Sequence, residues 1–526
     1  MKHTFLGVAF LSVLSVCAVA QTDSVAVQTT ATKVYLEGAD SLVFNQLTNP
    51  DAQILKGNVI FRHDSTYMYC DTAFFYELTN SLEAFGQVRM EQGDTLFVYG
   101  DYLYYDGNTQ LANLRRNVRM ENNQVTLYTD SLDYNRLANI GYYFEGGSLV
   151  DESNRLTSFY GQYSPDTKLA IFNDSVRLYN PEYTLYSDTL HYSTDTKIAL
   201  ILGPSTIVTD SGTIHTTRGW YDTANNTSLL LDRSRLVSKE RILVGDSIHY
   251  DRETGFGEAF GNIFIQDTAK HIILKGEYGY YDEKTDFAFV TDSACFLECS
   301  TADTLYLHAD TLHMLTVDST YREVKAFHSV RFFRSDIQGV CDSMLFNTRD
   351  SVLYMYTDPI LWNDDYQMTG DTICLFMNDT AIDYAHIQRL AFAIQQIDSA
   401  HYNQLKGNAL KAFFAGKAAR QIDVEGNAES IFYPIEADGA MLNMNETKSS
   451  YLSIWIADNK LEKLKIWPAP QGTIRPLSDL TPDQQKLKDF QWLDYIRPKS
   501  KDDIYTVVKR NIEEAAPKRS SNRFKR

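Results

Sequence analysis

The feature that most constrains this chain is a repeat with a period of 29 residues. Most copies carry an Asp followed by alternating residues and a tyrosine, then a turn, as in "SDTLHYSTDTKIA" (187–199), while Phe159, Thr217 or Glu277 replaces the Asp in the others. Successive copies are separated by 29, 29, 29, 29, 29 and 31 residues, counted from Tyr105, Tyr134, Tyr163, Tyr192, Tyr221, Tyr250 and Tyr281. Self-similarity at a fixed period is typical of an array in which one small unit is stacked many times.

A second element alternates with the first, as in "AFGQVRM" (84–90), "LRRNVRM" (114–120) and "AFGNIFI" (259–265). Each repeat therefore contains two runs of about eleven residues, separated by turn-forming stretches such as "QGD" (92–94) and "DGN" (106–108). The chain has 34 Tyr and 28 Phe, residue types that favour strands. Two turns per repeat predict hairpin after hairpin, in an antiparallel meander.

The apolar residues within one run do not keep the parity of a straight strand. Leu185 and Leu190 are five residues apart, as are Leu127 and Leu132. Side chains of a strand alternate between its faces, so the two leucines of each pair would point in opposite directions. A bend or bulge near the Asp would turn both inward. We therefore predict an all-β fold in which each run bends across two packed sheets, as a jelly-roll-like sandwich or an open, folded-over sheet. A parallel β-solenoid is the alternative.

The repeat and its flanks predict the organisation of the chain. We expect a signal peptide at 1–20, a linker at 21–31, the regular repeat array at 32–330, a looser continuation at 331–475, and a helical segment with a basic tail at 476–526. The helix is suggested by "SDLTPDQQKLKDFQWLDYIR" (478–497), where Thr481 is a candidate N-cap and Pro482 lies in the first turn.

The first residues have the pattern of a secretory signal peptide. Lys2 and His3 precede an apolar run from Phe5 to Val19, and Ala18-Val19-Ala20 resembles a cleavage site. Cleavage after Ala20 predicts export. Lipidation at Cys17 is disfavoured by the Val before it.

Two repeated polar positions invite a functional interpretation. Asp occupies the same place in many copies, including Asp71, Asp101, Asp130, Asp188 and Asp246. We interpret it as a bend residue that bonds a nearby backbone N–H. His191, His249 and His313 share one position that other copies fill with Phe, Tyr, Trp or Leu. Such variation predicts an outward-facing position, and no metal site is expected.

The overall charge excludes one class of partner. The net charge is −19, which argues against nucleic acid, because phosphate binding needs a basic surface. The sign reverses only at residues 497–526, with ten Lys/Arg against four Asp/Glu. This tail is either a solvated end or a contact with an anionic partner.

The inward-facing positions of successive repeats form an apolar and aromatic stripe. Its candidate members are Leu103, Tyr105, Leu132, Tyr134, Tyr163, Leu190, Tyr192, Tyr221, Ile248 and Tyr250. They predict either an ordinary core or an apolar groove that holds acyl chains, each buried CH₂ contributing about 0.8 kcal/mol. The sequence leaves open whether the sheets close or gape.

The alternation in "AFGQVRMEQGDTLFVYGDYLYYD" (84–106) resembles the OstA-like family of periplasmic lipopolysaccharide-transport proteins, which includes bridge proteins of the LptA type. The resemblance is good over 32–330 and looser over 331–470. It implies an elongated antiparallel β-jelly roll with a V-shaped interior that binds lipid. It also implies a periplasmic location, lipopolysaccharide or a related acylated glycolipid as ligand, and other jelly-roll proteins bound end to end.

Two other functions stay open at this point. One is a repetitive β-scaffold that binds surface glycans or proteins, and the other is a glycan-acting enzyme on a β-solenoid. No catalytic motif, nucleotide loop or cofactor fingerprint occurs in the sequence. We therefore expect no enzyme activity, no catalytic residues and no cofactor.

Overall fold

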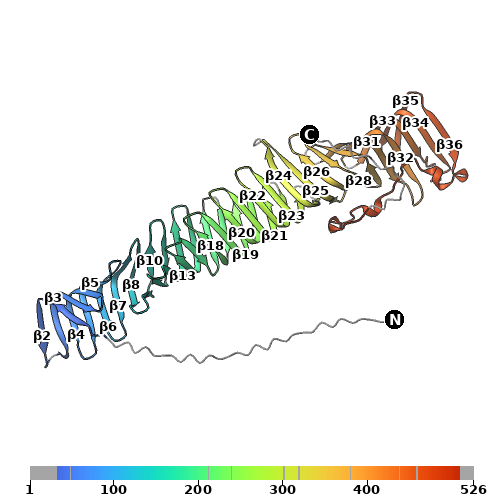
Figure 1. The fold of residues 1–526 in the computed structure, drawn as a ribbon. Coiled ribbons are helices and arrows are strands. Elements are labelled where there is room, and N and C mark those ends of the chain that lie inside the picture. Colours follow the sequence, from blue (N-terminus) through green and yellow to red (C-terminus); the bar gives the residue numbers. More distant parts are fainter. Residues whose placement is uncertain are drawn as a thin grey trace, which may run out of the picture.

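The protein is a long rod of antiparallel strands that lie across its axis (Figure 1). This computed structural model describes residues 32–509, with gaps at 48, 211, 239, 270, 300–302, 318–319, 379–380, 417, 437–438 and 458–459. The predicted signal peptide, the linker before residue 32 and the tail beyond residue 509 lie outside these residues.

The described residues form 36 strands joined in one continuous hydrogen-bonded sheet and four short 3₁₀-helices. The strands are β1 (Tyr35–Gly38), β2 (Ser41–Asn45), β3 (Asn49–His63), β4 (Thr66–Tyr76), β5 (Ser81–Gln92), β6 (Leu96–Asp106), β7 (Leu111–Asn122), β8 (Val125–Asn135), β9 (Ile140–Tyr143), β10 (Gly147–Val150), β11 (Arg155–Ser158), β12 (Tyr160–Ser164), β13 (Leu169–Asn180), β14 (Tyr183–Ser193), β15 (Ile198–Ile201), β16 (Ser205–Thr209), β17 (Gly212–Thr216), β18 (Arg218–Asp222), β19 (Thr227–Ser238), β20 (Arg241–Asp251), β21 (Phe256–Asp267), β22 (Ile272–Asp282), β23 (Phe287–Glu298), β24 (Leu305–Val317), β25 (Tyr321–Arg334), β26 (Ile337–Asn347), β27 (Val352–Tyr356), β28 (Ile360–Asn363), β29 (Tyr366–Thr369), β30 (Thr372–Asn378), β31 (Ala381–Gln396), β32 (Tyr402–Ala415), β33 (Ala418–Phe432), β34 (Asn443–Ala457), β35 (Lys460–Trp467) and β36 (Gln471–Pro476).

Every pairing between consecutive long strands is antiparallel, as in β4–β5 and β5–β6. The turns use the chemistry expected from the sequence: at the β6–β7 turn the Asp106 carboxylate accepts the backbone N–H of Asn108 at 2.9 Å. The all-β, jelly-roll-like prediction is therefore confirmed. The segment 387–414, which has moderate helix propensity, forms parts of β31 and β32.

The predicted bend is a two-residue bulge, and it recurs along the rod. Gly86 and Gln87 both have positive φ and together oppose the single residue Asp101 on β6. A Cβ on Gly86 would lie 2.6 Å from Asp71 Oδ2 on the other neighbouring strand, so glycine serves both the dihedral and the close approach. The same arrangement places Asp130 opposite Arg116 and Asn117.

The repeated aspartates accept hydrogen bonds from the bulge residues, as expected for bend residues. The backbone N–H of Asn117 donates to Asp130 at 3.1 Å, and its side chain donates to Asp101 at 2.6 Å. Asn262 links Asp246 and Glu277 in the same way, at 2.7 and 3.0 Å. One bulge residue thus ties together the strands on both sides of it, and the bend is cross-linked along the rod.

The bend divides each long strand between two faces of the fold. We call the half that contains the β5–β6 turn the first sheet, and the half that contains the β6–β7 turn the second sheet. Leu185 lies on the first sheet and Leu190 on the second, and both are fully buried. The parity argument is confirmed, because both leucines point into the space between the sheets.

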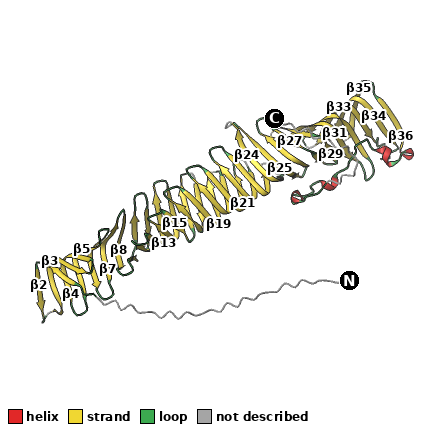
Figure 2. Ribbon diagram, in the orientation of Figure 1, coloured by secondary structure: helices red, strands yellow, loops and turns green. Residues whose placement is uncertain are grey.

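The predicted helix is only partly formed. Residues 477–509, which we call the C-terminal strap, run back from β36 toward β24 (Figures 1 and 2). They contain the four 3₁₀-helices η1 (Leu477–Asp479), η2 (Pro482–Gln485), η3 (Asp494–Ile496) and η4 (Asp503–Tyr505). Thr481 caps η2 and Pro482 begins it, as expected, but Gln485 ends it.

The strap is held on the outer face of the first sheet by side chains that replace a pairing strand. Gln404 donates to the Gln485 carbonyl and accepts from the Leu487 N–H, both at 2.8 Å. Gln367 holds Gln491 and Leu493 in the same manner, at 2.8 and 2.7 Å. These backbone groups would otherwise lack partners, which is why an irregular segment can lie against a sheet.

Candidate functional site

The predicted inward residues are buried, and most of them fill the interior instead of lining an open groove. Leu103, Tyr105, Leu132, Tyr134, Tyr163, Leu190 and Tyr192 are each at most 2% exposed and belong to one core cluster that extends from Val34 to Tyr221. Ile248 belongs to a separate, smaller cluster, and Tyr250 is only partly buried. The sheets therefore close over the first part of the array.

The tyrosines of this stripe close the gap between the free edges of the two sheets. The Tyr134 hydroxyl donates to Gln92 Oε1 at 2.9 Å, and the Tyr192 hydroxyl donates to Asp151 Oδ2 at 2.5 Å. In both pairs the tyrosine comes from the second sheet and its acceptor from the opposite edge of the first. Each such bond inside the fold contributes about 1 kcal/mol.

Burial and these bonds shift the acidity of the groups involved. Burial raises the pKa of Tyr134 and Tyr192 above the usual value, so both hydroxyls stay protonated and can donate. Burial opposes the charge on Asp151, yet hydrogen bonds from Tyr192 and Lys197 outweigh it and lower the pKa of that carboxyl. At neutral pH the two tyrosine hydroxyls are therefore protonated and the Asp151 carboxyl is ionised.

The contact nearest the N-terminal end is sensitive to pH. The His63 ring is fully buried, and its Nδ1 lies 2.6 Å from the Tyr105 hydroxyl and accepts from Arg136 at 3.1 Å. Burial, followed by the Arg136 charge, lowers the pKa of His63 from its usual 6.5. Below about pH 6.5, His63 binds a proton in the unfolded chain but not in the folded chain. The free energy of unfolding therefore falls as the pH drops below that value.

We expect the free energy of unfolding to decrease between pH 7.5 and pH 5.5, measured by urea titration. His63→Gln removes the titrating group while keeping hydrogen-bonding atoms, so its stability is expected to change less over that interval. The exposed His215 provides the control, because His215→Gln should leave the pH dependence of the wild type unchanged. An equal pH dependence in wild type and His63→Gln would contradict the assignment.

Between Ile207 and Met314 the interior is partly hollow, and the core is packed again in the strands that follow. A cavity of about 310 Å³, a size within reach of organic ligand sites, lies between the sheets. Its apolar lining consists mainly of Ile207, Ile214, Leu236, Leu243, Ala259, Ile263, Ile265, Leu274, Ala288 and Met314. Of the predicted residues, only Tyr221 and Tyr250 line it.

Three repeat positions explain why the fold is hollow here. At the edge of the first sheet, Leu96, Val125 and Tyr183 recur at multiples of 29 residues, and the next copy is Gly212. On the second sheet, Phe172 and Leu230 occupy a position whose next copy is Ala259. Gly279 occupies the position that Ile248 holds in the preceding repeat, two residues before the repeated tyrosine. Small residues thus coincide in one place, and the packed core gives way to a cavity.

Ion pairs bracket the mouth of this cavity. On one side, Arg252 lies 3.1 Å from Glu182 across the gap between the sheets. On the other side, Arg241 donates to the Tyr281 hydroxyl at 2.9 Å and lies 3.7 Å from Asp286. Arg322 is paired with the same Asp286 at 3.4 Å. Tyr250 lies between these brackets and lines the cavity.

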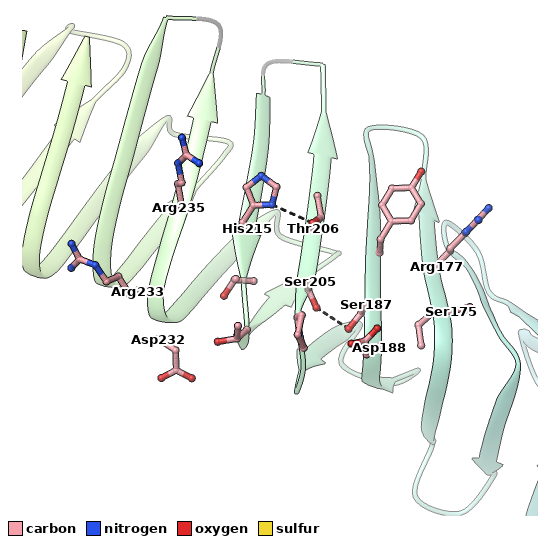
Figure 3. Close-up of a pocket in the computed structure, with 15 residues that line it drawn as sticks. Ser175, Arg177, Ser187, Asp188, Ser205, Thr206, His215, Asp232, Arg233 and Arg235 are labelled. Atoms are coloured by element: carbon pink, nitrogen blue, oxygen red, sulfur yellow. Dashed lines mark hydrogen bonds between the residues drawn. The ribbon is translucent and has the colours of Figure 1, made fainter. Parts of the chain in front are cut away.

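A second hollow, on the outer face of the first sheet, has a different character. Figure 3 shows Arg177, Thr206, His215 and Arg235 on neighbouring strands around a space of about 570 Å³. Thr206 and His215 are bonded at 3.2 Å, and Ser205 donates to Ser187 at 2.7 Å. The space is polar and open, and it lies outside the apolar interior.

Sequence reasoning missed the residues that make the cavity. Gly212, Ala259 and Gly279 carry no chemical motif, and each is small at a position that is large in most other copies. Ala84 holds the Ala259 position within the packed N-terminal core, so only the coincidence of three small residues marks the cavity. The outward placement of His191, His249 and His313 is confirmed, since each directly follows a residue that is buried on the inner face, namely Leu190, Ile248 and Leu312.

A protein family and a solved structure are each similar to a part of this chain. Residues 31–188 match the OstA-like protein family. A solved structure of LptH, described as the LptA-homologous periplasmic component of the lipopolysaccharide transport device of Pseudomonas aeruginosa, is 13% identical, with a TM-score of 0.21. That match covers 26% of this chain and 93% of LptH. No curated protein matches the chain.

Neither a membrane-spanning helix nor a metal-binding cluster is found in the described residues. No helix among residues 32–509, apart from the gaps, is long and apolar enough to cross a membrane. In the same part of the chain, no group of three or more His, Cys, Asp or Glu residues is placed to hold a metal ion.

Proposed function

We propose, on the basis of the OstA-like character of residues 31–188, that this protein binds and transfers an acylated glycolipid of the lipopolysaccharide class in the periplasm. The cavity between Ile207 and Met314 is the observation that carries the proposal. It offers an apolar lining, it lies between the two sheets, and its mouth opens between the brackets Glu182–Arg252 and Arg241–Asp286.

The closed N-terminal part restricts how a lipid would enter. Core side chains occupy the interior from Val34 to Tyr221, so an acyl chain cannot lie there without displacing them. Entry through the side, between the two ion-pair brackets, requires no such displacement. The N-terminal repeats then serve as a rigid arm that positions the lipid-binding section.

The ends of the rod suit contacts with other β-structured proteins. At the N-terminal end, β2 pairs with β3 alone among the described residues, and Leu42, Val43 and Phe44 are at least half exposed. At the C-terminal end, Leu464 and Ile474 are exposed on β35 and β36. Edge strands that carry apolar side chains favour pairing with another sheet edge, which supports end-to-end assembly with partner jelly rolls.

Filling the cavity is expected to abolish lipid binding. Ala259→Phe introduces the residue that the equivalent position, Phe172, carries in a packed repeat, so the backbone geometry at this site accepts it. The ring would occupy the space proposed for the acyl chain. Binding of purified lipopolysaccharide, measured by a fluorescence displacement assay, should weaken at least tenfold.

The control for this experiment lies in a packed repeat. His191→Phe adds a ring on the outer face, where other repeats carry Phe74 or Trp220, and should leave binding unchanged. If Ala259→Phe folds and binds lipopolysaccharide as well as the wild type does, the cavity is not the lipid site.

A further inference from the structure

The outer face of the second sheet carries a continuous group of aromatic rings directly behind the cavity. We call it the aromatic platform, and it consists of Phe256, Phe260, Tyr278, Tyr280, Phe287, Phe289, His313 and Phe327. Each ring contacts another: Tyr280 stacks on Phe289 with centroids 5.1 Å apart, and His313 lies 5.2 Å from Phe289. Phe260 is 45% exposed, and the other rings are partly buried.

The platform reaches the mouth of the cavity through one hairpin. Tyr280 and Tyr281 are consecutive on β22 and point to opposite faces. Tyr281 bonds to Arg241 and Asp286 at the mouth, at 2.9 and 2.8 Å, whereas Tyr280 stacks on the platform. Phe287, the first residue of β23, continues the platform to the same edge. A molecule that leaves the mouth over this hairpin therefore meets aromatic rings.

The charges around the platform select among possible occupants. Glu258 lies between Phe256 and Phe260 on the outer face of β21 and accepts the Tyr278 hydroxyl at 3.1 Å. Lys325, the register partner of His313 on β25, is paired with Glu323 at 2.9 Å. Burial, followed by the Lys325 charge, lowers the pKa of His313, which keeps that ring neutral. An anionic membrane surface or a phosphate would be repelled by Glu258, and Arg241, Arg252 and Arg322 at the mouth are already paired with carboxylates.

A saccharide fits this combination. The faces of a sugar ring present C–H groups that pack on aromatic rings, while its hydroxyls donate to acceptors such as a carboxylate. We propose that the aromatic platform binds the saccharide part of the glycolipid whose acyl chains occupy the cavity. This inference rests on the proposed function and adds that recognition of the ligand extends over the edge of the second sheet.

The test compares two lipids on four proteins. The probes are lipopolysaccharide that carries core sugars and its lipid anchor without sugars, each titrated by fluorescence displacement. The wild type should bind the sugar-bearing lipid about tenfold more tightly, the size expected when two rings contribute. Tyr280→Ala combined with Phe289→Ala should remove this difference and leave the affinity for the lipid anchor unchanged.

Two further variants control for loss of folding and for location. Tyr354→Ala combined with Tyr356→Ala removes another stacked pair of rings on the second sheet, away from the mouth, and should keep the wild-type difference. Glu258→Gln keeps every ring and should reduce the sugar contribution severalfold, even if the double alanine variant does not fold. Circular dichroism reports the folding of each variant.

The outcomes separate the two proposals. If the wild type binds the lipid anchor and the sugar-bearing lipid equally well, the platform inference is overturned while the proposed function stands. If neither lipid binds, the proposed function itself fails, and the platform inference fails with it. A sugar-dependent difference that survives both the double alanine variant and Glu258→Gln would place saccharide recognition elsewhere on the protein.

Discussion

Leu190→Ala is expected to destabilise the central repeats by roughly 3 kcal/mol or more, the cost of a large-to-small change in a packed core. Leu190 is fully buried on β14, where it faces its register partners Phe172 and Ile201. Both partners are also buried, so the space left by the removed methyl groups cannot be filled by a small rearrangement. Leu185→Ala should cost a similar amount, since Leu185 is buried to the same extent on the other side of the bend.

Hydrogen exchange is the suitable measurement for this prediction, because a stacked array can open locally without unfolding as a whole. Protection of the backbone amides of β13, β14 and β15 should decrease in both variants. Leu200→Ala on β15 is the matched control: Leu200 is 39% exposed, and its replacement should change protection little. If only one of the two leucines on β14 proved sensitive, the bend that brings both inside would be wrong.

Leu493→Asp is expected to release the C-terminal strap from the first sheet. Leu493 is 4% exposed and packs in a small apolar cluster with Ile360, Trp362 and Ile496. A carboxylate at this position would have no cationic partner within the cluster, and burying an unpaired charge costs several kcal/mol. Detachment of the strap is the less costly alternative, since Gln367, Gln404 and Arg331, which donates to the Ile496 carbonyl at 2.9 Å, can then bond to water.

Limited trypsin digestion and tryptophan fluorescence should report this release. In the variant, cleavage after Lys486, Lys488 and Lys499 should become faster, and emission should shift to longer wavelength as Trp362 meets water. Val507→Asp provides the control within the same strap, because Val507 is 75% exposed. Unchanged digestion in Leu493→Asp would show that the strap is held by contacts other than this cluster.

The interior illustrates how far repeat comparison reaches for a candidate site. The tyrosines at 105, 134, 163 and 192 were placed correctly on the inner face, because their period and parity are properties of the sequence. Their hydroxyl partners, such as Gln92 and Asp151, come from the opposite sheet edge, and no local pattern links them to the tyrosines. The cavity was not predicted for a related reason. It depends on Gly212, Ala259 and Gly279 lying close together in the fold.

The helical segment shows a limit of another kind. Thr481 and Pro482 correctly mark the start of a helix, but capping is a local effect that does not determine length. Tertiary contacts with Gln404 and Gln367 draw residues 485–493 into an extended course along the sheet. The predicted boundary between the arrays at 330 and 331 stays a prediction.

The sequence by itself determined the repeat, the antiparallel hairpins, the bend in each strand and the inward set of leucines and tyrosines. These follow from backbone geometry and side-chain periodicity, which act within one hairpin. Only the tertiary structure decided where the sheets close and where they part, because that depends on the summed volume of side chains from both sheets. It also decided that tyrosine contacts close the N-terminal part, that ion pairs bracket the mouth, and that the strap covers the outer face. Each of these joins residues from separate repeats, whose proximity is a result of stacking.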